Sequence, residues 1–279
     1  MRFIRYFLFD LKQGALHNKA LLLTPAAIGA LVFLDFLLKA HRYLAIGAIE
    51  ESVSYGDYWF YLYGGMKEYT PGPDNAFSFP VVWMIVFVAV PFALVNYPFR
   101  DMGGIGQQIL VRSRSRNIWW LSKCCWNFVG TVLYHLLLQA VGAALFLLFR
   151  MDLTYRIHMD FIRVVYDALH EELWERSALP LAMLVLPVLV SATVNMLQMT
   201  LSLFVRPMFG FFAATLLLLA SAYLMSPVLA GNYAMAYRYD WMLKGGVTGR
   251  AGLTVAAALL VAALLLGLVR FHFYDILEE

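Results

Sequence analysis

The stretch RDMGGIGQQILVRSRSRNIWWLSK, residues 100–123, lies between two long apolar runs and determines how the chain is threaded through a membrane. Apolar residues dominate 80–99 before it and 124–149 after it. The stretch holds a single acid, Asp101. Its five cations are Arg100, Arg112, Arg114, Arg116 and Lys123. Short loops rich in Lys and Arg stay in the cytoplasm. We therefore expect this loop to face the cytoplasm.

The composition of the chain is that of an integral membrane protein. Of its 279 residues, 62% are hydrophobic and 14% are charged, whereas a soluble domain is roughly half apolar and about a quarter charged. The mean hydropathy is +0.70. The net charge is only +3 and the basic residues are spread along the chain, which argues against nucleic acid as a partner. The only cysteines, Cys124 and Cys125, are adjacent, so no outer loop holds a disulfide pair.

Six apolar runs predict six transmembrane helices. About 20 apolar residues are enough for a helix to cross a hydrocarbon core roughly 30 Å thick. The predicted spans are 20–40, 80–99, 124–149, 180–205, 210–230 and 251–269. The sequence thus predicts an all-α, multi-pass protein of the plasma membrane, with one transmembrane domain over residues 1–279 and both termini in the cytoplasm.

The segments outside these spans have their own patterns. Residues 2–16 place apolar side chains at helical spacing among cations, which predicts an amphipathic helix along the inner membrane surface. Residues 41–79 form a long outer loop whose tyrosines and Trp59 suit the headgroup level. Residues 150–179 predict an amphipathic outer helix. Asp35 and Lys39 are four residues apart and predict a local ion pair near the membrane interface.

The second predicted span holds a proline in its middle. Pro91 removes a backbone hydrogen bond from the helix, and Pro98 lies at its inner end. We therefore expect span two to bend at Pro91.

Familiar catalytic motifs are missing from the sequence. There is no GxxxxGK[ST] phosphate loop, and no HExxH, CxxC or GxSxG pattern. The motif EExxxR, formed by Glu171, Glu172 and Arg176, resembles the first motif of the CPBP intramembrane proteases, but the later histidine motifs of that family do not follow. We therefore expect no enzymatic activity, and no cofactor or metal bound by this chain.

The basic loop carries a more informative pattern. It places an acid, a glycine, a leucine, a Ser-Arg step and a Ser-Lys step in order, at Asp101, Gly106, Leu110, Ser115–Arg116 and Ser122–Lys123. This pattern resembles the loop between spans two and three of ABC type-2 exporter permeases, although Asp101 replaces the more usual glutamate. The layout of six spans with an N-terminal amphipathic helix resembles the same family.

The resemblance implies a membrane permease that works with other subunits. Separate ABC ATPase subunits would bind and hydrolyse ATP, and a second permease copy or a related permease would complete the membrane part. The residues between spans two and three would form a short cytoplasmic coupling helix. The nearly uncharged spans favour an amphipathic peptide, a lipid or a hydrophobic compound as substrate.

The predicted coupling helix covers about residues 102–111. It would present Ile105, Ile109 and Leu110 as an apolar patch for a groove on a soluble partner. Alternatively, this patch dips into the lipid interface, where Arg112, Arg114 and Arg116 would pair with lipid phosphates.

Polar residues within or near the predicted spans are candidates for lining a substrate path. These candidates are Asn96, His135, Gln139, Asn195 and Gln198. Bonding between helices is the commoner use of such side chains.

Two rival functions are open at the level of the sequence. One is a non-transporting interaction, immunity or sensory subunit that binds a peptide on its outer segments. The other is a secondary transporter, which needs an intramembrane acid coupled to ions. Asp35 is a poor candidate for that acid because Lys39 lies on the same helical face.

Overall fold

The structure is a computed structural model that describes residues 2–73, 76–104, 106–108, 110, 116–168 and 171–273. In these residues the regular secondary structure is helical, and strand pairing is limited to isolated bridges. Five helical segments are long and apolar enough to cross a membrane. They are α2 (Lys19–Ala45), α4 with α5 (Val81–Leu94 and Tyr97–Met102), α7 (Arg116–Leu148), α9 (Leu181–Leu201) and α11 (Gly249–His272). The predicted all-helical, multi-pass membrane fold is confirmed at this level.

A sixth apolar helix is shorter. α10 (Pro207–Tyr223) has 17 residues, which is about 25 Å of helix and less than a hydrocarbon core of roughly 30 Å. The sequence predicted a span over 210–230, but the helix ends at Tyr223 and Leu224 adopts an extended conformation. Beyond it the chain turns back into the short helices η2 (Ala230–Ala234) and η3 (Ala236–Arg238).

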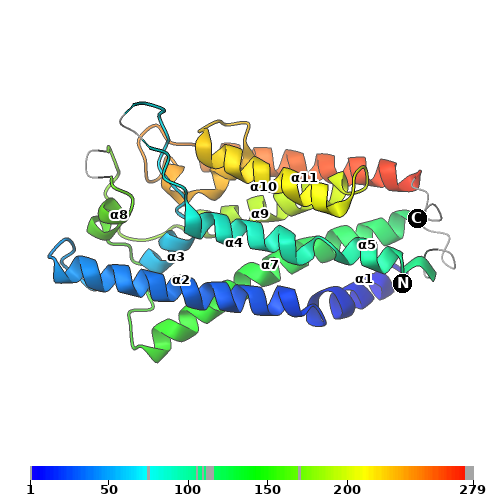
Figure 1. Ribbon diagram of the computed structural model, residues 1–279, viewed down its shortest axis with the longest axis horizontal. Helices are drawn as coiled ribbons and strands as arrows, with labels where there is room; N and C mark the ends of the chain where they lie inside the picture. Colours follow the sequence, from blue (N-terminus) through cyan, green and yellow to red (C-terminus); the bar gives the residue numbers. More distant parts are fainter. Residues whose placement is uncertain are drawn as a thin grey trace.

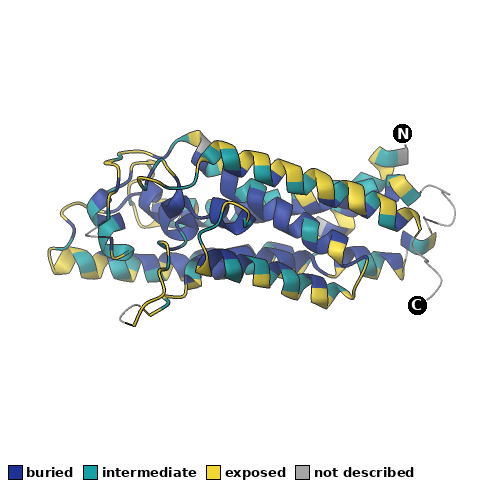
Figure 2. Cartoon of the chain, turned by 90° about the horizontal axis from the view of Figure 1, so that it is seen from above, coloured by how far each residue is buried: buried dark blue, intermediate teal, exposed yellow. Residues whose placement is uncertain are grey.

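The long helices form an elongated bundle with two different ends (Figure 1). α1 (Arg2–Asp10) and the end of α11 lie at one end, which we call the terminal end. α3 (Tyr55–Tyr63) and α8 (Met159–Val165) gather at the opposite end, which we call the cap end. Figure 2 shows exposed residues along the outer faces of the bundle and buried residues inside it. Exposed leucines such as Leu38 (71%) and Leu148 (73%) belong to those outer faces, as expected for helices surrounded by lipid.

The cap is more deeply packed than the sequence predicted. Every residue of α3 is buried, so its tyrosines and Trp59 are covered by protein, and the expectation that they anchor the chain at the headgroup level is wrong. A capping box at Ser54 and Asp57 starts this helix. The helix expected within 150–179 is reduced to the seven residues of α8. Phe161 and Ile162 of this helix are buried, as is Ile157 just before it.

The second membrane segment is interrupted after Pro91, at residues 95–96. The helix continues through Pro91 and ends at Leu94, and α5 restarts at Tyr97 with Pro98 in its first turn. Pro98 has no N–H to donate and its ring clashes with the carbonyl four residues earlier, that of Leu94, so the helix cannot continue past Leu94 without a break. Side chains bind carbonyls near the break: Gln198 Nε2 donates to the Pro91 carbonyl at 3.3 Å, and Asn18 Nδ2 to that of Ala93 at 3.1 Å. Non-helical backbone at membrane depth needs such partners.

Two further sequence expectations concern ion pairing and the first helix. The predicted pair is confirmed, since Lys39 Nζ lies 3.0 Å from Asp35 Oδ2. The predicted amphipathic helix at the N-terminus is α1, continued by the π-helix η1 (Leu11–Leu16). It packs against α7, so one of its faces is covered by protein.

Candidate coupling site

A buried ionic cluster lies at the terminal end, where the predicted coupling loop leaves and rejoins the bundle. Lys123, on α7, forms ion pairs with Asp10 of α1 and Asp101 of α5. The Lys123 Nζ to Asp101 Oδ2 distance is 2.6 Å. The side chains of Lys123, Asp10 and Asp101 are 1%, 3% and 7% exposed. One ammonium group therefore lies between two carboxylates with almost no water around it.

Neighbouring side chains complete the environment of the cluster. The hydroxyls of Tyr97 and Ser122 both donate to Asp10, the first at 3.0 Å. Lys123 Nζ lies 4.6 Å from the centroid of the Tyr97 ring and 4.7 Å from that of Trp119, within reach of cation–π attraction. Burying charges in this way is stable only when each is paired and hydrogen-bonded, and this cluster meets that condition.

Two glycines allow the elements of the cluster to approach closely. A Cβ at Gly106 would lie 2.2 Å from Asp101 Oδ2, so only glycine lets the chain after Gly104 lie on this carboxylate. A Cβ at Gly14 in η1 would lie 2.4 Å from Trp126 Nε1 on α7. The sequence pattern that drew attention to Asp101, Gly106 and Lys123 thus coincides with tight packing. A cleft of about 160 Å³, lined in part by Phe9 and Arg100, opens beside the cluster.

The other predicted loop residues fall into two groups. Four of them, Ile105, Ile109, Arg112 and Arg114, lie outside the described residues. Leu110 is buried, 4% exposed, in a core that includes Trp120 and Phe271. Its side chain therefore supports the loop from within and is not presented to a partner. Arg116 donates to the carbonyl of His272 at 2.9 Å, which ties the start of α7 to the end of α11.

Span three also starts earlier than predicted. α7 begins at Arg116, eight residues before the expected Cys124. Trp119 and Trp120 are buried and stack on Phe271. These two side chains therefore pack against α11 and are covered by protein.

The predicted path-lining residues do not form one site. Asn96 is exposed at the break between α4 and α5. His135 Nδ1 lies 2.9 Å from the Tyr63 hydroxyl, and Gln139 accepts a hydrogen bond from Tyr55, so these two residues hold α3 against α7.

Asn195 and Gln198 lie deeper, on α9, together with Asn127 of α7. Asn195 Nδ2 donates to Thr131 Oγ1 at 2.8 Å, and Asn127 Nδ2 lies 3.5 Å from the Asn195 carbonyl. Among the described residues, the side-chain oxygens of Asn127, Asn195 and Gln198 have no hydrogen-bond partner. The side-chain NH2 group of each residue therefore binds a neighbouring helix, while its side-chain oxygen stays without a donor in the protein interior.

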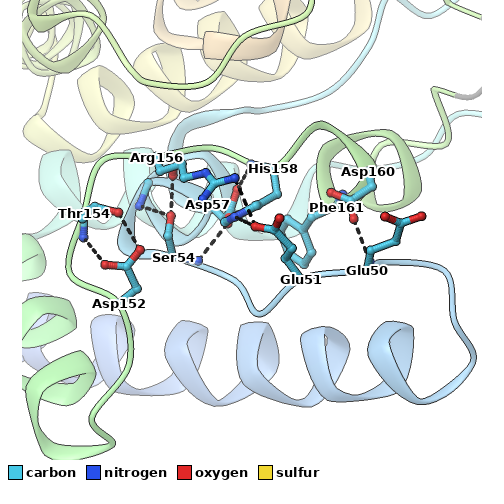
Figure 3. Close-up of polar contacts among 11 residues, drawn as sticks. Glu50, Glu51, Ser54, Asp57, Asp152, Thr154, Arg156, His158, Asp160 and Phe161 are labelled. Atoms are coloured by element: carbon cyan, nitrogen blue, oxygen red, sulfur yellow. Dashed lines mark hydrogen bonds and ion pairs between the residues drawn. The ribbon is translucent and has the colours of Figure 1, made fainter.

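The cap end holds a second polar cluster, shown in Figure 3. His158 Nδ1 lies 2.6 Å from Asp57 Oδ2, and His158 Nε2 lies 3.4 Å from Glu51, which also pairs with Arg156. The hydrogen bond to Asp57, which is buried, raises the pKa of His158 above its ordinary value. This cluster joins the start of α3 to the segment that leads into α8, so its role is to hold the cap together.

A third polar centre, also in the cap, surrounds Arg238. Its guanidinium donates to the carbonyls of Ser221 and Ala222 at the end of α10, at 2.6 and 2.8 Å. It also donates to the carbonyls of Met66 and Lys67 and to the side chain of Asn232. Burial lowers the pKa of Arg238 to about 10. The residue joins three cap segments through oxygen acceptors alone.

Sequence reasoning missed Asp10 and misjudged Lys123. Asp10 is the only acid before Asp35, and a lone acid on an apolar helix signals a buried partner. Lys123 was counted as a loop cation, although Trp119, Trp120, Cys124 and Trp126 surround it in sequence. Those flanks are the signal that could have indicated burial.

These observations define the class of the protein as an α-helical, multi-pass membrane protein with a buried ionic cluster at its terminal end. Residues 28–277 match the family described as "Protein of unknown function (DUF2705)", and the chain belongs to that family. No curated protein and no solved structure gives a match.

Proposed function

We propose that this chain is the membrane permease subunit of an ABC exporter, driven by ATP that separate ATPase subunits bind and hydrolyse. The observation that supports this most is the Lys123 cluster. It joins both ends of the basic loop, at Asp101 and Lys123, to α1 through Asp10. A force applied to the loop by a soluble partner would therefore move α1, α5 and α7 together.

The proposed topology has six spans with both termini in the cytoplasm. The start of the chain and the end of α11 lie at the same end of the bundle (Figure 1), which requires an even number of crossings. The five long segments give five crossings, and the shorter α10 would supply the sixth. The basic loop belongs to the terminal end, which the positive-inside rule assigns to the cytoplasm. The short α10 would then need local thinning of the bilayer.

The proposed motion uses the difference between a continuous and a broken helix. α7 has 33 residues without a proline, about 50 Å of helix, and reaches from the loop to the cap. The segment from α4 to α5 is interrupted at residues 95–96. We expect α7 to move as a rod and the interruption to absorb the change in angle. A partner can drive this only if it binds the two states with different affinity.

Paired spin labels test this motion in the assembled transporter. Labels at the exposed positions Asn117 and Leu147, both on α7, should keep one separation in nucleotide-free and nucleotide-trapped states. Labels at Phe92 and Arg100, on either side of the interruption, should change their separation. Constant distances for the second pair with changing distances for the first would refute the proposed motion.

The substrate proposed is an amphipathic peptide, a lipid or a hydrophobic compound. The described spans hold few charges, and Asp35 is paired with Lys39. A second permease copy or a related chain would supply the other wall of the path. Asn195 and Gln198, with their free side-chain oxygens, are the polar groups we propose for contact with a polar part of the substrate.

The experiment that tests the function is site-specific photo-crosslinking in native membranes. A photo-reactive amino acid at Gln108, which is exposed next to the cluster, should crosslink to a P-loop ATPase identified by mass spectrometry. The same amino acid at His41, exposed at the cap end of α2, should give no ATPase adduct. ATPase activity of the purified complex should fall when Lys123 is replaced by Met.

Other outcomes of this experiment contradict the proposal. Absence of an ATPase from the Gln108 adducts, and from the proteins that co-purify with the tagged chain, would refute the exporter assignment. A peptide or protein captured at His41 instead would favour the non-transporting interaction or immunity subunit. Transport that follows an ion gradient without ATP would favour a secondary transporter.

A further inference from the structure

A cleft at the cap end lies outside every site described so far. It has a volume of about 410 Å³ and lies between the ends of α2 and α7 and the segment 49–53. Apolar side chains form most of its wall, including Leu37, Leu44, Ile49 and Phe149. Ligand sites in proteins commonly have volumes of roughly 300–1,000 Å³ and mostly apolar walls.

The surroundings of the cleft place it at the boundary between lipid and water. Leu38 and Leu148, on the same two helices, are 71% and 73% exposed and belong to the apolar outer faces of the bundle. A few residues further on, the chain becomes polar, with His41, Arg150 and Asp152 lining the same cleft. An apolar wall that ends at an interface beside a guanidinium group matches the shape of an anionic amphiphile.

Arg150 occupies a backbone position that disfavours it. Its φ is +54°, in the left-handed region where α7 ends: Met151 N donates to the Phe146 carbonyl at 2.9 Å, and Arg150 N to that of Leu147 at 3.2 Å. This is the helix-end position that glycine normally takes, because a left-handed residue with a Cβ is strained. The fold alone therefore favours glycine here.

The arginine side chain has no structural partner that would explain it. Among the described residues, the guanidinium of Arg150 makes no ion pair and no hydrogen bond. The nearby carboxylate of Asp152 accepts hydrogen bonds from the amide and hydroxyl of Thr154, at 3.1 and 2.6 Å (Figure 3). A cation at a strained backbone position, beside an apolar cleft and with no ion pair among the described residues, points to a ligand-binding role.

We propose that this cleft binds an anionic phospholipid, with its phosphate on the Arg150 guanidinium and an acyl chain along Leu37, Leu44 and Phe149. The planar guanidinium binds phosphate oxygens in pairs. His41 supplies a second donor on the same rim. This site is independent of the proposed transport function, since it involves neither the basic loop nor an ATPase.

The backbone strain makes a sharp test possible. Arg150→Gly removes the charge and relieves the strain, so the variant purified without added lipid should unfold at the same temperature as the wild type or higher. Phosphatidylglycerol added to the wild type in detergent should raise its unfolding temperature saturably, whereas phosphatidylcholine or inorganic phosphate should not. Arg150→Gly should bind phosphatidylglycerol at least about tenfold more weakly than the wild type. Arg150→Lys should keep part of the rise in unfolding temperature.

A matched control and a second variant complete the experiment. Arg42→Gln removes an exposed cation of α2 that does not line the cleft, and it should leave phosphatidylglycerol binding unchanged. If Arg150→Gly does not fold, Arg150→Asn replaces it, since asparagine also tolerates the left-handed region. Equal effects of the two lipids on the wild type, an equal effect of inorganic phosphate, or an equal loss in Arg42→Gln would each overturn the proposal.

Discussion

Replacing Lys123 by Met is the perturbation with the largest expected effect. Methionine matches the length of the lysine stem but removes the ammonium group that pairs with both Asp10 and Asp101. The two carboxylates, 3% and 7% exposed, are then left buried without a counter-ion. Removing one partner of a buried ion pair costs about 3–5 kcal/mol. We expect Lys123→Met to destabilise the protein by that amount.

The charge balance of the cluster predicts a marked asymmetry among its members. Asp10→Asn leaves one ammonium with one carboxylate, and the new amide oxygen still accepts hydrogen bonds, so the expected cost is no more than about 1–2 kcal/mol. The triple variant with Asp10→Asn, Asp101→Asn and Lys123→Met contains no charge. Because neutral replacement of a buried ionic group is often nearly neutral for stability, this variant should lie within about 2 kcal/mol of the wild type.

Denaturant unfolding in detergent micelles, followed by tryptophan fluorescence, measures these differences. Trp119, one of the seven tryptophans, has its ring centroid 4.7 Å from Lys123 Nζ, so part of the signal comes from the cluster. The reasoning is refuted if Lys123→Met and Asp10→Asn are equally destabilising. It is also refuted if the triple variant is as unstable as Lys123→Met, because packing and not charge would then explain the loss.

Three further substitutions test the loop and the cap. Gly106→Ala places a Cβ 2.2 Å from the Asp101 carboxylate, so we expect a loss of about 1–3 kcal/mol and faster proteolysis of the loop. Hydrogen bonding to Asp57 raises the pKa of His158, so the stability that His158 contributes is complete below about pH 6.5 and is lost as the pH rises through the folded pKa. His158→Gln should therefore remove this pH dependence of stability, and melting curves from pH 6 to 9 should differ between wild type and variant. Arg238→Met leaves four carbonyls without their donor and should cost more than about 3 kcal/mol, measured by thermal unfolding; a loss under 1 kcal/mol would contradict its role.

Hydropathy was sufficient to predict the helical membrane fold, but helix ends depended on contacts that the sequence does not display. α7 is helical from Arg116 onward, and there Trp119 and Trp120 pack against Phe271 of α11, a contact between residues about 150 positions apart. α10 ends at Tyr223, where Arg238 binds the last carbonyls of the helix. A window of local sequence contains neither partner.

The burial of α3 shows a different limit of sequence reasoning. Its sequence, YGDYWFYLY, has the composition of an interfacial aromatic belt, and the same composition fills a buried cap. What separates the two cases is the presence of hydrogen-bond partners on α7: Gln139 accepts from Tyr55, and His135 bonds to the Tyr63 hydroxyl. Buried tyrosines need such partners for their hydroxyls.

The candidate site was predicted in part. Asp101 and Gly106 were singled out by the loop pattern and lie in the cluster, whereas Leu110 is buried and Asp10 was missed. The loop pattern is local, so it could identify the residues that share the loop. It could not identify a partner on α1, because nothing in the sequence says which helix packs against the start of α7.

Among the described residues, the two most deeply buried cations, Lys123 and Arg238, hold their neighbours in different ways. Arg238 is held by backbone carbonyls from two segments and by Asn232, so it cannot shift without breaking several hydrogen bonds at once. Lys123 has two carboxylates for one charge. Moving the ammonium towards one carboxylate would leave the other buried without its counter-ion, so the cluster holds α1, α5 and α7 together. The terminal end is therefore joined by charges on three helices, whereas the cap end is joined by backbone carbonyls around one guanidinium.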